Sequence, residues 1–328
     1  MRMRKKKNLT ARMDACRNYG ISDPASLRGS WRSLCPQARE VHVEVGCGKG
    51  RFTAGTAQAH PDVLLIAIEK VPDAMVVAME RCRDAGLTNV FFVDGDAAAL
   101  PDYFAPGEVD RLYINFCDPW PKSNQARRRL THGNFLQLYR RILKSGGEIH
   151  FKTDNDKLFA WSLEEIPQFG FALSEVTTDL HAQGPVGVMT DYEAKFYQDG
   201  KNINRCVATL TEAVLPFPTD LHRVKSRWMD AFALSISPEE LGRQVFAAGG
   251  HLWNVFQLRP CLADEDARQA LAQLDCSDAF VFWEDGPVQP LGDTPVPDLA
   301  EGFYLVDRDF SWTYAQSDSH HAFFCRRG

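Results

Sequence analysis

The segment VHVEVGCGKG, residues 41–50, constrains the fold more than any other part of the sequence. An apolar run of strand character ends just before three glycines, Gly46, Gly48 and Gly50, and a helix-forming run begins at Arg51. A strand, a glycine turn and a helix in this order form the loop with which a doubly wound α/β domain holds a nucleotide-like ligand. Glycines let the backbone approach that ligand closely, and the helix N-terminus offers free N–H groups. The sequence therefore predicts an α/β fold with a ligand loop after the first strand of its sheet.

Two side chains narrow the choice of ligand for this loop. The dinucleotide fingerprint places a small residue where this chain has Arg51, and a pyrophosphate gains nothing from Glu44, two residues before the first glycine. A carboxylate there favours a ligand with positive charge, such as S-adenosylmethionine with its ammonium and sulfonium groups. We therefore expect S-adenosylmethionine as the cofactor, with Glu44 facing its amino-acid end.

The length and composition of the chain predict two domains in a cytoplasmic protein. At 328 residues it exceeds the usual size of one domain, and its longest apolar runs are too short to cross a membrane. No hydrophobic segment follows the basic start MRMRKKK, and the nine cysteines contain no C-x-x-C pair. We expect a basic N-terminal arm at 1–40, a methyltransferase domain at 41–214 and a small α+β domain of unknown role at 220–328.

The net charge of −6 is unevenly distributed along the chain. Residues 216–328 contain 17 acidic and 9 basic residues, a balance of −8, which leaves a balance of +2 for residues 1–215. Residues 119–147 contain no acid and seven basic residues: Lys122, Arg127, Arg128, Arg129, Arg140, Arg141 and Lys144. A stretch of this kind can neutralise phosphates, so the total charge does not exclude a nucleic-acid partner.

Strands that alternate with helices predict a parallel sheet covered on both faces. The expected strands are residues 41–45, 63–68, 90–93, 111–116, 148–152, 169–174 and 203–210. Acidic residues stand at or just after the carboxyl ends of the first five strands: Glu44, Glu69, Asp96, Asp118 and Asp154. Ligands of open α/β sheets bind at that edge. We expect Glu69 to accept hydrogen bonds from the ribose hydroxyls and Asp96 to bind the adenine amino group.

The segment DPWPK, residues 118–122, follows the fourth strand. Its two prolines stiffen the turn, which lowers the entropy lost when a substrate is positioned. Asp118 and Lys122 are therefore expected to direct polar groups into the crevice, next to the basic run. His320, His321 and Cys325 lie close together near the end of the chain, but they have no fourth ligand in motif spacing, and we expect no metal site.

With these motifs assembled, the chain resembles the bacterial tRNA (guanine-N7-)-methyltransferases, the TrmB family, from its start to about residue 212. The resemblance rests on VEVGCGKG, IAIEK, GDA, NFCDPWPK, RRRLT, FKTDN and TDYEAKF. It implies a class I Rossmann-like methyltransferase with a mostly parallel seven-stranded sheet, S-adenosylmethionine as cofactor and tRNA as partner. The expected reaction is methylation of N7 of guanosine 46 in the variable loop.

The resemblance also implies roles for individual residues. The expected cofactor-binding residues are Glu44, Gly46, Gly48, Gly50, Glu69, Asp96 and Asp118, with Asp118 also the catalytic residue. The expected substrate-binding residues are Lys122, Asp154, Thr190, Asp191, Tyr192 and Glu193. One departure from the family is that Ser123, Asn124, Gln125 and Ala126 interrupt the basic run after DPWPK. The C-terminal part resembles an uncharacterised small bacterial domain with an aromatic run like Phe310 to Tyr314, FSWTY.

Two other functions are compatible with the cofactor motifs. A methyltransferase acting on a small amine or a protein side chain would not need the basic stretch at 122–144. A non-catalytic tRNA-binding protein would be expected to have lost parts of the cofactor pocket, whereas all three glycines and all five strand-end acids are present. The oligomeric state and the role of the C-terminal domain are left open by the sequence.

Overall fold

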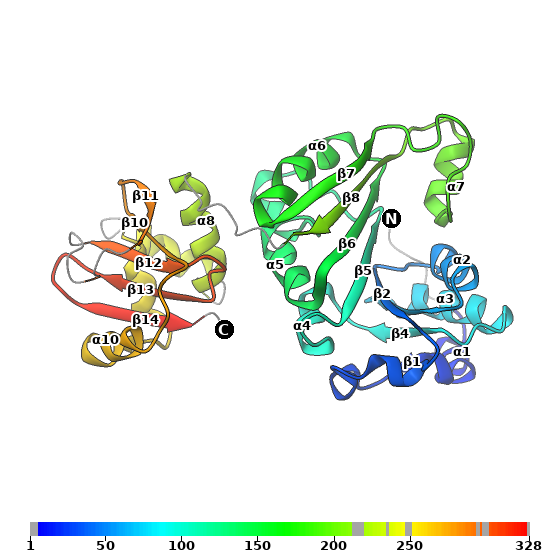
Figure 1. Cartoon of the computed structure of the whole chain (residues 1–328), viewed down its shortest axis with the longest axis horizontal. Helices are drawn as coiled ribbons and strands as arrows, with labels where there is room; N and C mark the ends of the chain where they lie inside the picture. The colour runs from blue at the N-terminus through cyan, green and yellow to red at the C-terminus, as the bar shows by residue number, and fades with distance from the viewer. Residues whose placement is uncertain are drawn as a thin grey trace. The chain divides into compact units, whose positions relative to one another are not determined.

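A computed structural model describes residues 6–211, 220–233, 236–246, 251–292, 296 and 302–326. The chain divides into two compact units, Met1–Val214 and Leu215–Gly328 (Figure 1). The first five residues of the basic arm and the proline-rich junction at 215–219 lie outside the described residues. In the described part of the chain, no helix is both long enough and apolar enough to span a membrane.

Within the described residues, the first unit contains one sheet of eight strands, in the order β1-β4-β3-β2-β5-β6-β8-β7. Its strands are β1 Gly20–Ile21, β2 Glu40–Val45, β3 Val63–Glu69, β4 Val90–Asp94, β5 Val109–Asn115, β6 Leu143–Thr153, β7 Phe171–Thr177 and β8 Asn204–Leu210. Neighbouring strands are parallel from β1 to β6, and β8 runs antiparallel to both β6 and β7. The Rossmann-like, mostly parallel architecture expected from the sequence is confirmed.

The sheet has one strand more than the seven expected. The additional strand is β1, whose two residues pair with Phe92 and Val93 at the edge of the sheet. A strand of two residues shows no alternation in the sequence, so it forms only where the folded sheet offers it a partner.

Helices cover both faces of this sheet (Figure 1). They are α1 Leu9–Ala15, α2 Arg51–Ala59, α3 Pro72–Asp84, α4 Leu100–Tyr103, α5 Gly133–Ile142, α6 Asp156–Glu165 and α7 Asp191–Gln198. All seven residues of β3 are buried, as expected for a parallel strand with both faces covered. Leu136 and Phe159 pack on one face, and Phe52 and Met79 pack on the other.

The described part of the N-terminal arm packs on the domain. Arg12 of α1 forms two hydrogen bonds, of 2.7 and 2.6 Å, to the carboxylate of Glu80 in α3. Trp31 is fully buried, with its ring stacked 5.1 Å from that of Phe104. From α1 onward the arm is therefore part of the folded unit rather than a solvated tail.

The second unit is an antiparallel sheet in the order β11-β10-β12-β13-β14-β9, with helices packed against it. Its elements are α8 Leu221–Phe232, α9 Pro238–Glu240, β9 Leu262–Ala263, α10 Asp264–Ala272, β10 Ala279–Trp283, β11 Val288–Pro290, β12 Phe303–Asp307, β13 Trp312–Gln316 and β14 Ala322–Arg326. Phe310, Trp312 and Tyr314 of the aromatic run are all buried. These rings belong to the cores on the two faces of the sheet, not to an exposed surface.

Candidate cofactor and substrate site

The glycine loop joins β2 to α2 with three residues in the left-handed region. Gly46, Gly48 and Gly50 have φ angles of 76°, 58° and 73°. A Cβ on Gly50 would lie 2.4 Å from the Cβ of Ala78, so the close approach of α2 to α3 requires glycine there. A Cβ on Gly46 or Gly48 would meet no atom within 4 Å. The backbone on that side of the loop is therefore accessible to a ligand.

A small cavity of about 100 Å³ opens beside this loop, where β2, β3 and β4 end. It is lined by Val45, Gly46, Ile68, Glu69, Lys70, Gly95, Asp96, Ala97 and Leu130. Three predicted cofactor-binding residues, Gly46, Glu69 and Asp96, thus surround one space. Parallel pairing produces this arrangement, because Glu69 pairs with Asp94 and Val45 pairs with Ile68.

Glu69 holds the glycine loop as well as facing the cavity. Its carboxylate accepts hydrogen bonds from the backbone N–H groups of Gly48 and Val71, both at 2.9 Å. A carboxylate has about four acceptor positions, so capacity remains for two hydroxyl groups. Asp96 is half exposed, accepts a hydrogen bond from the N–H of Ala98 at 3.1 Å and lies 3.5 Å from the Lys70 ammonium.

Glu44 differs from these acids because it is only 1% exposed. Its carboxylate accepts hydrogen bonds from Thr53 at 2.6 Å and Asn115 at 3.4 Å. Burial is the main cause that raises the pKa of Glu44 to about 7, and the bonds from Thr53 and Asn115 act in the opposite direction. That Glu44 faces the cofactor stays a prediction; in the structure its side chain lies beneath the loop and ties β2 to α2 and β5.

The loop after β5 presents Asp118 on a strained backbone. Asp118 is exposed, while Phe116 and Trp120 on either side of it have φ angles of 54° and 41°. Aromatic residues rarely adopt this conformation, and such strain persists where surrounding contacts enforce it, often at active sites. Arg129 supplies contacts of this kind, donating hydrogen bonds to the carbonyls of Pro119 at 3.2 Å and Trp120 at 3.0 Å.

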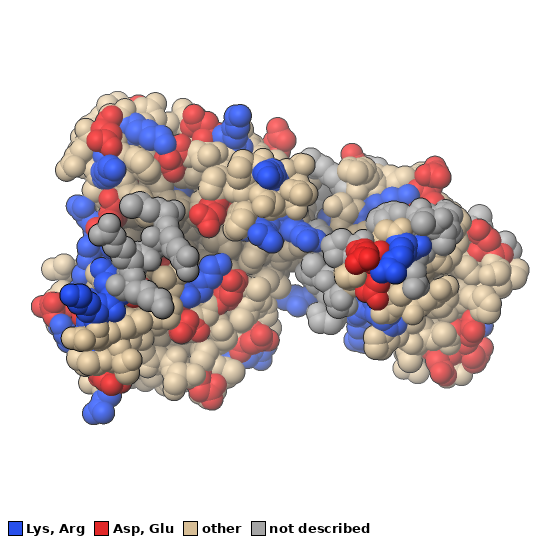
Figure 2. Space-filling model, turned by 180° about the vertical axis from the view of Figure 1, so that it is seen from behind, with Lys and Arg blue, Asp and Glu red and all other residues tan. Residues whose placement is uncertain are grey.

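Side chains of the basic run after this loop pack on aromatic rings and also face the solvent. The Arg128 guanidinium lies 4.9 Å from the centre of the Trp120 ring, and Arg129 lies 4.5 Å over the ring of Trp161. Lys122, Arg127 and Arg128 are exposed. On the face seen in Figure 2, Lys and Arg side chains are interspersed with Asp and Glu, and neither sign forms a continuous surface.

The remaining predicted substrate residues lie at the ends of β6 and α7. Asp154 follows β6 and is paired with the Lys201 ammonium. Asp191 lies 3.1 Å from Arg81 of α3, and Tyr192 is 61% exposed. These side chains present polar or aromatic surface that a substrate could contact at the carboxyl edge of the sheet.

Thr190 and Glu193 instead form a capping box at the start of α7. Each side chain bonds the backbone N–H of the other residue, at 3.0 and 3.1 Å. Glu193 is fully buried and also binds Lys152 at 2.6 Å and His181 at 3.1 Å. That Glu193 binds substrate directly stays a prediction; in the structure its carboxylate has no exposed face.

Sequence reasoning did not single out Lys152 or His181 as part of the site. The T-x-x-E pattern of residues 190–193, which is the signature of a capping box, was the available signal that Glu193 bonds to its own helix. Nothing in the local sequence indicates the partners of Lys152 and His181, since they come from other elements.

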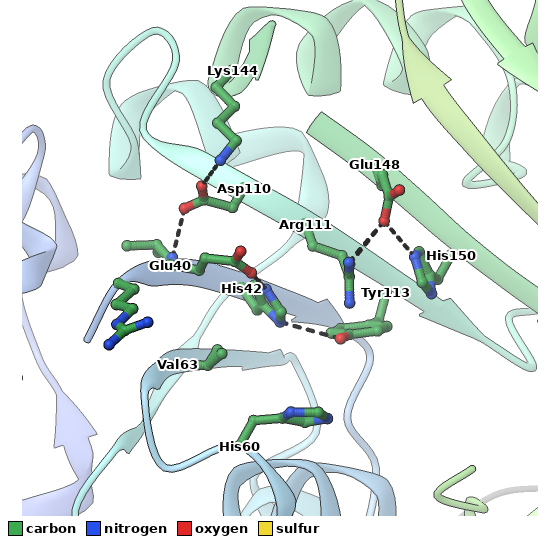
Figure 3. A network of polar contacts seen from close by, with 12 residues as sticks. Glu40, His42, His60, Val63, Asp110, Arg111, Tyr113, Lys144, Glu148 and His150 are labelled. Atoms are coloured by element: carbon green, nitrogen blue, oxygen red, sulfur yellow. Dashed lines mark hydrogen bonds and ion pairs between the residues drawn. The ribbon is translucent and has the colours of Figure 1, made fainter. Parts of the chain in front are cut away.

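A polar network continues along β2, β5 and β6, on the same face of the sheet as Glu44 (Figure 3). His42 bonds Glu40 at 2.7 Å and the Tyr113 hydroxyl at 3.1 Å, and His150 bonds Glu148 at 2.8 Å. Burial is the main cause that lowers the pKa of both histidines, to about 4 for His150. Both rings are therefore neutral near pH 7, and the network joins strands instead of supplying a charge to the site.

The described residues contain no group of three or more His, Cys, Asp or Glu side chains placed to hold a metal ion. The Rossmann-like sheet, the open glycine loop and the acid-lined cavity fit a methyltransferase that uses S-adenosylmethionine. In agreement, residues 38–206 match a family described as putative methyltransferase, and residues 217–326 match a domain of unknown function, DUF4275.

Individual relatives indicate which methyltransferases this chain is similar to. A tRNA (guanine-N(7)-)-methyltransferase of Geobacillus kaustophilus is 46% identical over 209 residues, covering 63% of this chain and 96% of the relative. The enzyme of the same name from Streptococcus suis is 44% identical, covering 63% and 99%. Among solved structures, the 16S rRNA methyltransferase KamB covers 56% of this chain and 93% of its own, at 17% identity and a TM-score of 0.44. The chain belongs to the tRNA (guanine-N7-)-methyltransferase family.

Proposed function

We propose that the first unit transfers a methyl group from S-adenosylmethionine to N7 of a guanosine in tRNA, at position 46 of the variable loop. The observation that carries the proposal is the 46% identity to a tRNA (guanine-N(7)-)-methyltransferase over 96% of that protein. The basic segment beside the exposed Asp118 supports an RNA substrate over a small amine. A tRNA substrate also implies a cytoplasmic enzyme.

The residues around the glycine loop fit the proposed cofactor. The backbone at Gly46 is accessible to a ligand, and Glu69 can accept hydrogen bonds from two ribose hydroxyls. The half-exposed Asp96 can accept a hydrogen bond from an adenine amino group. When bound, S-adenosylmethionine supplies an electrophilic methyl group on a sulfonium. Glu44 contributes from below the loop, by fixing the direction in which β2 ends.

The reaction requires little proton chemistry from the protein. N7 of guanine carries a lone pair and no proton in the neutral base, so no general base is needed to activate it. The protein must bring N7 into line with the methyl group and stabilise the positive charge that develops on the purine. Asp118 is suited to both tasks, because its exposed carboxylate can accept from the guanine N–H groups and can offset the new charge.

The substrate would be held around this carboxylate by exposed side chains. Lys122 offers a cation for a phosphate, and Tyr192 offers an aromatic face on which a base can stack. Asp154 and Asp191 can accept hydrogen bonds from base or ribose groups in addition to their ion pairs with Lys201 and Arg81. Thr190 and Glu193 contribute indirectly, through the start of α7.

The test is methylation of tRNA by the full chain and by Asp118→Asn, with labelled cofactor and mass spectrometry of the digested tRNA. We expect 7-methylguanosine from the parent and a fall in kcat of roughly a hundredfold or more for Asp118→Asn, because loss of one preorganised charge interaction has effects of this order. Asp102→Asn, on α4 and away from the cavity, is the control. Methylation at another atom, or none with both proteins folded and binding cofactor, would refute the proposal.

A further inference from the structure

Three buried ionisable side chains lie together outside the cofactor cavity: Lys152, His181 and Glu193, here called the clamp. Their exposed fractions are 7%, 7% and 0%. Lys152 is the last but one residue of β6, Glu193 lies in the first turn of α7, and His181 belongs to the loop between β7 and α7. None of the three is needed for the chemistry proposed above, yet burying charged groups is costly unless they are paired.

Every polar interaction in the clamp has a consistent donor and acceptor. Nδ1 of His181 accepts from the N–H of Val186 at 3.2 Å, so the proton of the neutral ring is on Nε2 and is donated to Glu193 Oε1 at 3.1 Å. Glu193 Oε2 accepts from the Lys152 ammonium at 2.6 Å and from the N–H of Thr190 at 3.1 Å. Both carboxylate oxygens are therefore bonded within the protein.

These hydrogen bonds fasten one segment, residues 181–190, here called the strap. Lys152 also donates to the carbonyl of Val188 at 3.2 Å. Val188 in turn packs on α2, where a Cβ added to Gly55 would lie 2.6 Å from its Cγ1. The strap thus runs from the clamp to the helix that begins at the glycine loop, and Figure 1 shows α7 next to α2.

The strap leads directly into residues available to a substrate. It ends at Thr190, and the next two residues are Asp191 and the 61% exposed Tyr192. We propose that Lys152, His181 and Glu193 are positioning residues, which touch no substrate and hold the strap so that Asp191 and Tyr192 face the RNA. This inference rests on the proposed function, since it concerns the RNA side of the same site.

The experiment compares His181→Phe, which keeps an aromatic ring and removes both hydrogen bonds of the imidazole, with His181→Gln, which keeps a donor toward Glu193. Amide hydrogen exchange of residues 183–190 should be about tenfold faster or more in His181→Phe and within about threefold of the parent in His181→Gln. The KM for tRNA should rise about tenfold in His181→Phe, with the Kd for S-adenosylmethionine changed less than about twofold.

His150→Phe is the matched control, since it removes another histidine–glutamate hydrogen bond, of 2.8 Å, from the same strand as Lys152. It should leave exchange of the strap and the KM for tRNA unchanged. The exchange measurement needs no methylation, so the clamp can be supported even if the enzyme acts on another substrate.

Three results would overturn the assignment. If His181→Phe exchanges in the strap like the parent, the clamp does not hold this segment. If His181→Phe has parental exchange and parental KM while Glu193→Gln alone loses activity, Glu193 acts on the substrate directly after all. Loss of cofactor binding in His181→Phe, with His181→Gln unaffected, would instead make the clamp a support of the cofactor site.

Discussion

At the scale of single residues, the acids at the strand ends have different tasks despite their similar places in the sequence. Glu69 and Asp96 border the cavity, Asp118 is exposed on a strained loop, and Glu44 is buried beneath the glycines. The difference follows from exposure and from the donors nearby. A carboxylate buried beneath the loop, such as Glu44, stabilises the loop, and one that borders the cavity or the solvent can bind a ligand.

Glu69→Ala and Asp96→Ala should both weaken cofactor binding, and Glu69→Ala should do so more. Loss of a charged acceptor typically costs about 1.5–3 kcal/mol, roughly tenfold or more in affinity. Glu69→Ala also frees the N–H groups of Gly48 and Val71, which loosens the loop. Titration calorimetry with S-adenosylmethionine measures both effects, with Asp102→Ala as the control. Parental affinity in both variants would contradict the assignment.

His150 should make the stability of the protein depend on pH. Its pKa is lowered to about 4 in the folded state, chiefly by burial, and is near 6.5 when unfolded. Between these values the unfolded chain binds more protons, so the free energy of unfolding falls as the pH is lowered. The loss due to His150 is on the order of 2 kcal/mol between pH 7 and pH 5.

Urea denaturation at both pH values, in the parent and in His150→Phe, measures this dependence. The variant should be less stable at pH 7 and should lose less on acidification. Equal losses in the two proteins would show that His150 does not carry the effect.

At the scale of elements, the short basic segment after β5 both binds the backbone of its own loop and presents cations to the solvent. Arg129 donates to the carbonyls of the DPWPK loop, whereas Arg127 and Arg128 present exposed cations. A run of three like residues therefore does not form one uniform surface. The direction in which each side chain leaves the turn decides whether it binds the loop or faces solvent.

Substituting Arg127 and Arg128 together with alanine should flatten the salt dependence of tRNA binding. On a duplex, each phosphate that is no longer neutralised by a cation reduces the slope of log affinity against log salt by about 0.9. Arg129→Ala should change this slope less and lower kcat more, because the loop that presents Asp118 loses the hydrogen bonds that Arg129 donates to the carbonyls of Pro119 and Trp120. Filter binding over a salt series, together with initial rates, separates the two effects. Identical slopes in parent and double variant would make Arg127 and Arg128 a merely solvated surface.

At the scale of the whole molecule, the features proposed for catalysis all lie in one compact unit. The match to the methyltransferase family ends at residue 206, the second family match begins at residue 217, and the two compact units meet at Val214 and Leu215. Each unit has its own buried core. We propose on this basis that the first unit alone binds cofactor and tRNA.

A chain that ends at Val214 should fold and still methylate N7 of guanosine in tRNA. Removal of the acidic tail, with its charge balance of −8, should also tighten non-specific RNA binding, since the tail repels phosphates. Turnover at saturating tRNA should change little. If the shortened protein is soluble and binds cofactor but transfers no methyl group, the C-terminal unit completes the active site. The proposal that the first unit acts alone is then wrong.

The sequence by itself determined the sheet, the glycine loop and the family, because these depend on local patterns. Buried parallel strands read as apolar runs, and turns read as glycines in fixed places. Only the tertiary structure decided that Glu44 and Glu193 are buried. Their partners, Asn115, Lys152 and His181, come from distant segments, and no local pattern specifies which side chains meet when those segments pack. The same reason explains β1, which exists only because β4 offers it an edge.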